Sequence, residues 1–145
     1  MRHITFSLIC LAALGLAITI SGEAQQADKS KAEPAVKQLS SDEFKALLEK
    51  GDKSLFFLDV REARELEEIG TVKGYYHIPL GELENRLSEV PKDKVIVTFC
   101  QRGGRAGRAG EILVKNGYKV AGACGVAPLK AENYPLIYPK LSEKK

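Results

Sequence analysis

From position 40 onward, apolar residues recur with the periods of helices and strands in alternation. Ser40 and Glu43 form a capping box, which predicts that a helix begins there. Its apolar face carries Phe44 and Leu48, and Gly51 is expected to end it. The pattern therefore predicts that this helix opens the globular part of the chain.

Short apolar runs rich in β-branched and aromatic residues predict strands, and segments with helical spacing separate them. The expected strands are Leu55–Val60, Tyr75–Pro79, Val95–Phe99 and Tyr118–Gly122. The further expected helices are Arg61–Ile69, Leu83–Val90, Ala106–Lys115 and a final turn or two over Ala127–Tyr134. Strands that alternate with helices indicate an α/β fold, with a mostly parallel sheet and helices on both faces.

The N-terminal segment has a different pattern. Arg2 and His3 precede an almost wholly apolar stretch from Ile4 to Ile20, and small residues follow up to Ala24. This order is typical of a secretory signal peptide over residues 1–24, so we expect cleavage after Ala24 and a periplasmic or secreted protein. The stretch also approaches the ~18 apolar residues of a spanning helix, so an uncleaved membrane anchor is the alternative.

The rest of the chain divides into three parts. Residues 25–38 are polar and charged without apolar periodicity, and we interpret them as a flexible tether. Residues 39–137 are enough for one α/β domain with a single core. Residues 138–145 form a charged C-terminal tail.

Charge and composition narrow the function classes. The 145-residue chain has a formal net charge of +3, which is too slight and too spread for a nucleic-acid surface. We find no metal-ligand cluster and no nucleotide motif, so we expect neither a metal nor a cofactor. Membrane contact is expected only at the N-terminal segment.

Cys100 stands at the end of the uncharged run Val95–Phe99 and opens the loop before the next helix. A strand without charges is typical of a parallel sheet buried on both faces, so Cys100 should lie at the sheet edge where such folds bind ligands. Gly103 and Gly104 allow positive φ angles. The N–H groups of the loop can then point inward, beside the positive end of the helix dipole.

Two arginines, Arg102 and Arg105, add positive charge to this loop. Positive surroundings favour the thiolate of a cysteine, which is its nucleophilic form. We therefore interpret Cys100 as a reactive nucleophile in an anion cradle, and a buried, inert cysteine is the alternative. Arg108, one helical turn beyond Arg105, is more simply a solvated surface residue.

Four segments have an order and spacing that are specific when taken together. They are Leu58-Asp59-Val60-Arg61 with Glu65 following, Gly70 through Ile78-Pro79, the strand and loop at Cys100, and Asn116-Gly117-Tyr118-Lys119-Val120. In these the chain resembles a single-domain rhodanese of the exported bacterial type, over about Leu39 to Pro135. The resemblance implies the rhodanese fold, a mostly parallel five-stranded sheet flanked by helices.

The resemblance also implies thiosulfate sulfurtransferase activity. Cys100 would take a sulfane sulfur from a donor such as thiosulfate, hold it as a persulfide and pass it to a thiol or cyanide acceptor. A thiol on a partner protein would serve in the same way. Arg105 and Arg102 would bind the anion, and the backbone of Gln101, Gly103 and Gly104 would form the cradle.

Asp59 and Arg61 match the strand-end pair of that family. We interpret them mainly as a structural pair that orients the wall of the site, with direct substrate contact as the alternative. The chain has Gly70-Thr71-Val72-Lys73 where family members often carry Gly-His-Ile-Pro. The lone His77 is then more simply a core residue with satisfied hydrogen bonds than a catalyst.

Loop length separates sulfur chemistry from phosphate chemistry. Related phosphatases need a Cys-x5-Arg loop to surround a phosphate, whereas Cys100 and Arg105 are separated by four residues. The smaller loop favours a sulfur atom over a phosphate.

Cys124 has three interpretations. It is a small core or loop residue, a resolving thiol that attacks a Cys100 persulfide or forms a redox-switch disulfide, or half of a permanent disulfide. The last would consume the nucleophile. The competing function is therefore a non-catalytic module that binds sulfur anions, or a thiol redox module that uses both cysteines.

Overall fold

The computed structural model describes residues 36–141, which belong to one compact unit, Ala32–Lys145. The predicted signal peptide, most of the predicted tether and the last four residues of the predicted tail lie outside the described residues. Within 36–141, no helix has both the length and the apolar character needed to cross a membrane.

Helices and strands alternate as the sequence predicts. Their bounds are α1 Ser41–Lys50, β1 Leu55–Asp59, α2 Ala63–Ile69, β2 Tyr75–His77, η1 Leu80–Glu89, β3 Val95–Cys100, α3 Gly104–Lys115, β4 Lys119–Gly125 and α4 Ala127–Ala131. The capping box at α1 is present, with the Ser40 hydroxyl accepting from the Glu43 N–H, and Gly51 ends the helix at φ 62°. η1 is a 3-10 helix with a break at Arg86, where a regular helix was expected.

The sheet has the order β2-β1-β3-β4, and all of its pairings are parallel. The expected α/β rhodanese-like fold is confirmed, with four strands among the described residues instead of five. At the outer edge of β4, Gln38 forms a single parallel bridge with Ala123. Its neighbours close this bridge, because the Leu39 N–H donates to Ala123 and the Ala123 N–H donates to Lys37, each at 2.8 Å. Residues at the end of the predicted tether therefore extend the edge of the sheet.

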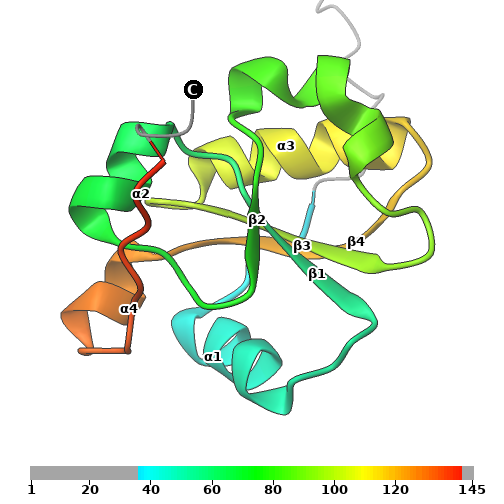
Figure 1. The fold of residues 1–145 in the computed structure, drawn as a ribbon. Helices are drawn as coiled ribbons and strands as arrows, with labels where there is room; N and C mark the ends of the chain where they lie inside the picture. The colour runs from blue at the N-terminus through cyan, green and yellow to red at the C-terminus, as the bar shows by residue number, and fades with distance from the viewer. Residues whose placement is uncertain (1–35, 142–145) are drawn as a thin grey trace, which may run out of the picture. The chain divides into compact units, whose positions relative to one another are not determined.

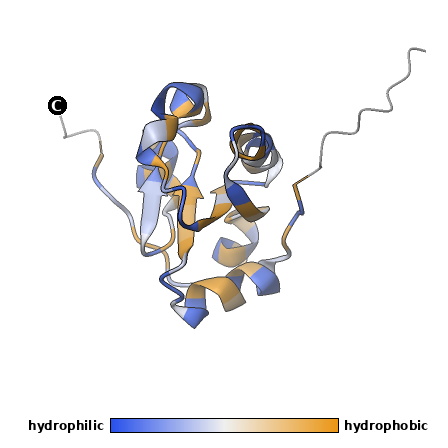
Figure 2. Cartoon of the chain, turned by 90° about the vertical axis from the view of Figure 1, so that its right-hand side faces the viewer, coloured by the Kyte–Doolittle hydropathy of each residue, from blue (hydrophilic) through white to orange (hydrophobic). Residues whose placement is uncertain are grey.

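Helices cover both faces of the sheet (Figure 1). One core cluster joins the sheet to α3 and η1 through Ala109, Leu113 and Leu83. The other joins it to α1 and α4 through Phe44 and Leu129. Figure 2 shows hydrophobic and hydrophilic residues mixed along each helix, as expected for helices with one buried stripe.

The C-terminal segment runs past α2 (Figure 1). Ile137 pairs with Thr71 in an antiparallel bridge, with N–H to O distances of 2.8 Å in both directions. Tyr138 lies so close to Gly70 that a Cβ there would meet its ring at 3.0 Å. The start of the predicted tail therefore packs on the domain.

Candidate active site

β3 places Cys100 at the carboxyl edge of the sheet. Its side chains alternate between the two cores, with Phe99 in the cluster of α1 and α4 and Cys100 in the cluster of α3 and η1. Thr98 faces α3 as well, since its hydroxyl donates to the Ala106 carbonyl at 2.9 Å. The thiol therefore lies under the beginning of α3.

Gly103 shapes the loop around the sulfur. It has a φ of 94°, the left-handed region that glycine adopts most easily, and it caps α3. Its N–H donates to Cys100 Sγ at 3.1 Å. Gly104 is the first residue of α3 and has no positive φ, so only Gly103 makes the predicted turn. The sulfur therefore meets a backbone donor at the positive end of a twelve-residue helix.

The end of β4 anchors the other side of the loop. The Val126 N–H donates to the Cys100 carbonyl at 2.9 Å, and the Ala127 N–H donates to the Gln101 carbonyl at 3.0 Å. Between these bonds the loop passes directly over Gly125, where a Cβ would stand 2.7 Å from the Gln101 carbonyl oxygen. Sequence reasoning missed Gly125, although a glycine directly after Cys124 is a signal for a close backbone approach.

The loop encloses a pocket of about 410 Å³ that contains the predicted cysteine and both predicted arginines. Its lining residues are Cys100, Gln101, Arg102, Gly104 and Arg105. Cys100 itself is 2% exposed, so it forms the floor. Arg102 is exposed and has no ion-pair partner in the part of the chain that the structure describes. The predicted catalytic and substrate-binding residues thus come together at one small opening.

Arg105 is bound to a carboxylate that sequence reasoning did not assign. Its Nη1 and Nη2 donate to the two oxygens of Glu65, both at 2.6 Å, across 40 residues of sequence. This hydrogen-bonded pair lowers the pKa of Glu65 and raises the pKa of Arg105. The only sequence signal was the acidic residue of the family-like segment that begins at Leu58.

Asp59 and Arg61 form a fully buried ion pair next to the site. Arg61 Nη2 donates to Asp59 Oδ2 at 2.6 Å and to the Gly70 carbonyl at 2.9 Å, and Thr71 Oγ1 donates to Asp59 at 2.8 Å. Both charged side chains are 0% exposed. Neither lines the pocket at Cys100, so the geometry favours the structural interpretation over substrate contact. His77 Nε2 lies 2.7 Å from the Arg61 carbonyl oxygen, so this ring nitrogen has a hydrogen-bond partner.

The sequence predicted that this strand ends at Gly122, but β4 continues to Gly125. Cys124 therefore lies within β4. It pairs with Phe99 and shares its core, so the two sulfurs point to opposite faces of the sheet. Both cysteines are free thiols, and Cys124 donates to the Thr98 carbonyl at 3.6 Å. Of the three interpretations of Cys124, the permanent disulfide is therefore not the one observed. Burial raises the pKa of the Cys124 thiol.

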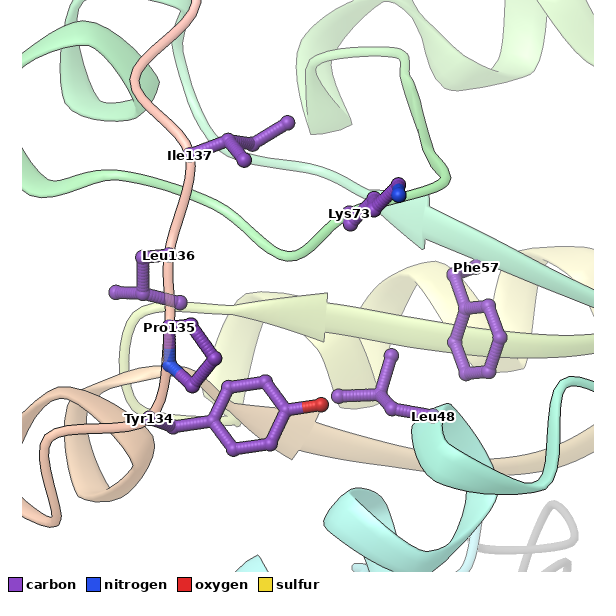
Figure 3. Close-up of a pocket in the computed structure, with 7 residues that line it drawn as sticks. All are labelled: Leu48, Phe57, Lys73, Tyr134, Pro135, Leu136 and Ile137. Atoms are coloured by element: carbon purple, nitrogen blue, oxygen red, sulfur yellow. The ribbon is translucent and has the colours of Figure 1, made fainter.

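Another pocket, of about 350 Å³, lies between α1, β1 and the C-terminal segment. Figure 3 shows the Tyr134 ring pointing from that segment toward Leu48 of α1. Phe57 of β1 also lines this pocket. Its lining contains one cation, Lys73, and no cysteine. This pocket therefore has no thiol that could carry a sulfane sulfur.

Similar proteins point to the same family as this geometry. Residues 40–123 match the Rhodanese-like domain. "Uncharacterized protein YqhL" of Bacillus subtilis is 39% identical over 82 residues, which are 57% of this chain and 61% of that protein. "Putative sulfurtransferase YtwF" of the same organism is 30% identical over 90 residues, which are 62% of this chain and 85% of that protein. A solved rhodanese-related protein from Thermoplasma volcanium has a TM-score of 0.55 at 31% identity, covering 65% of this chain and 94% of that one.

Proposed function

We propose that this chain, which belongs to the rhodanese family, is a sulfurtransferase that carries sulfane sulfur as a persulfide on Cys100. The donor is thiosulfate or a related sulfur compound, and the acceptor is cyanide or a thiol, including a thiol on a protein. The observation that supports this most directly is the Gly103 N–H, 3.1 Å from Cys100 Sγ at the start of α3.

The first step is attack of the Cys100 thiolate on the outer sulfur of the donor. With thiosulfate, a bond forms between Cys100 Sγ and that sulfur while the sulfur–sulfur bond of the donor breaks. Sulfite leaves with the electron pair, and the persulfide anion remains on Cys100. The Gly103 N–H and the helix dipole stabilise negative charge at the sulfur before and after this step.

The second step returns the enzyme to its thiolate. The acceptor attacks the outer sulfur of the persulfide and removes it, so that Cys100 leaves as the thiolate. Arg102 is exposed at the rim of the pocket, where it can guide anionic donors and acceptors toward the opening.

Intact-mass spectrometry of the reduced protein, before and after excess thiosulfate, tests the proposal. We expect a gain of about 32 Da, one sulfur atom, that cyanide removes again. Cys100→Ser should abolish the gain. Cys124→Ser should retain it, because Cys124 lies on the other face of the sheet. The starting mass of the protein after export also checks the predicted cleavage after Ala24.

The alternative is the binding or redox module. If neither thiosulfate nor a persulfide adds sulfur to the parent protein, the sulfurtransferase proposal is wrong. A reduced protein that becomes two hydrogens lighter under mild oxidation would indicate a Cys100–Cys124 disulfide, which requires β3 and β4 to rearrange.

A further inference from the structure

We infer that the preferred sulfur donor is an alkyl persulfide, with at most one negative charge, and not the thiosulfate dianion, because Glu65 neutralises Arg105 at the mouth of the pocket. This inference rests on the proposed function and names its substrate class. It follows from the ion pair between Arg105, which lines this pocket, and Glu65, and Glu65 is the specificity-determining residue.

The pocket contains one uncompensated cation instead of two. Arg102 and Arg105 both line it, but Arg105 donates two 2.6 Å hydrogen bonds to Glu65. The Arg105 and Glu65 side chains are 36% and 23% exposed, so solvent screens their charges only in part. Since the pair is neutral as a whole, Arg102 supplies the net positive charge at this opening.

Glu65 is held in place from its own helix. It is the third residue of α2, and its Oε2 also accepts the backbone N–H of Glu62 at 3.1 Å, which completes a capping box. The carboxylate therefore cannot follow Arg105 toward a bound anion without breaking that cap. Arg105 is fixed in turn by its place in the first turn of α3. Two helices thus hold the pair from both sides.

The two donor classes place different charge in the pocket. Thiosulfate carries two negative charges and the Cys100 thiolate carries one. The pocket must then stabilise three negative charges with the single net positive charge of Arg102. An alkyl persulfide that reacts as R–S–SH adds no negative charge. The Cys100 thiolate bonds to the outer sulfur, the sulfur–sulfur bond of the donor breaks, and the products are Cys–S–SH and R–S⁻. The Gly103 N–H and Arg102 can balance that single charge. The free N–H groups of Arg105 can still donate to either donor, but without net charge.

Glu65→Gln is the test, since glutamine has the size of glutamate and also completes a capping box, but lacks the charge. The measurement is the rate of sulfur loading on Cys100 by intact mass, with thiosulfate and with the persulfide of 2-mercaptoethanol. We expect the parent to load faster from the persulfide. Glu65→Gln should speed loading from thiosulfate by about fivefold or more and change persulfide loading by less than about twofold.

Glu68→Gln is the matched control. It lies on the same helix and also pairs with an arginine, Arg64, at 2.6 Å, but both side chains are largely exposed. It should leave both rates unchanged. A second measurement needs no variant: added salt should slow thiosulfate loading of the parent only weakly, since little net charge attracts the dianion.

The outcomes separate this inference from the proposed function. If both donors load Cys100, and the ratio of the two loading rates is the same in the parent and in Glu65→Gln, the inference is wrong but the proposed function stands. A steep salt dependence in the parent would do the same, because it would indicate two uncompensated arginines. No loading from either donor would overturn the proposed function and the inference with it.

Discussion

At the scale of the residue, Cys100 and Cys124 show how one sheet edge gives two thiols different surroundings. Cys100 faces α3, receives a backbone hydrogen bond and forms the floor of an open pocket. Cys124 is as buried as Cys100, but it faces the other core, and its thiol donates to the Thr98 carbonyl at 3.6 Å. A backbone N–H at the start of a helix stabilises a thiolate, whereas a thiol that donates to a carbonyl is held in its protonated form. This geometry favours the prediction of Cys100 as the nucleophile, and it favours a packing role for Cys124.

The burial of Cys124 predicts a specific pH dependence of stability. Its pKa is raised in the folded protein, first by burial and then by the nearby Cys100 and Asp59. Below about pH 8.5, the ordinary value, folded and unfolded chains both keep the proton. Above it only the unfolded chain loses the proton, so the free energy of unfolding should fall, by up to about 1.4 kcal/mol per pH unit.

Urea unfolding of the parent and of Cys124→Ala, from about pH 7 to about pH 10, measures this effect. Alanine does not titrate, so the variant should lose less stability as the pH rises, whatever its stability at neutral pH. Cys100 is present in both proteins, so its own titration contributes to both curves. Parallel curves for the two proteins would contradict the prediction.

At the scale of the element, the loop from β3 to α3 depends on the end of β4. Two backbone bonds from Val126 and Ala127 hold the loop, and Gly125 leaves room for its backbone. α3 then begins directly above the sulfur. The geometry at Cys100 is therefore set by the contact of two elements as well as by the loop sequence.

Gly125→Ala should therefore disturb the site. The new Cβ would lie 2.7 Å from the Gln101 carbonyl oxygen and 3.0 Å from Arg102 Cα, both backbone atoms that cannot turn away. Displacement of the loop should slow sulfur loading of Cys100 by about tenfold or more, since catalytic groups tolerate little misplacement. Gly81→Ala is the control, because a Cβ there meets nothing within 4 Å. Equal loading rates in the two variants would contradict this role of Gly125.

At the scale of the whole molecule, a buried network joins distant parts of the chain. Asp59 at the end of β1 binds Arg61 and Thr71, and Arg61 also binds the Gly70 carbonyl at the end of α2. Thr71 in turn pairs with Ile137. The network therefore links the sheet, α2 and the C-terminal segment beside the candidate active site.

Arg61→Met should destabilise the fold by about 3–5 kcal/mol, because it leaves the Asp59 carboxylate buried without its partner. That is a large part of the ~5–15 kcal/mol of a typical domain. Arg64→Met removes an exposed arginine–glutamate pair and should leave the stability nearly unchanged, because solvent screens such a pair. Urea unfolding of both variants measures the difference. Similar losses would show that the buried pair has no special role.

The sequence by itself determined the local features of this protein. The capping box at Ser40, the uncharged strand before Cys100 and the glycine turn at Gly103 all depend on neighbouring residues, and all were predictable. The alternation of helices and strands also implied the parallel sheet and its two covered faces. Together they placed Cys100, the predicted nucleophile, at the carboxyl edge of a parallel sheet in the confirmed fold.

Only the tertiary structure decided which charges pair and which way each thiol points. Glu65 and Arg105 lie 40 residues apart, and no local pattern indicated their bond. The face of Cys124 depends on the length and register of β4, and a shift of one residue would reverse it. Local preferences act over a few residues, whereas pairing and facing depend on how complete elements pack, so the charge of the pocket emerges only in the folded chain.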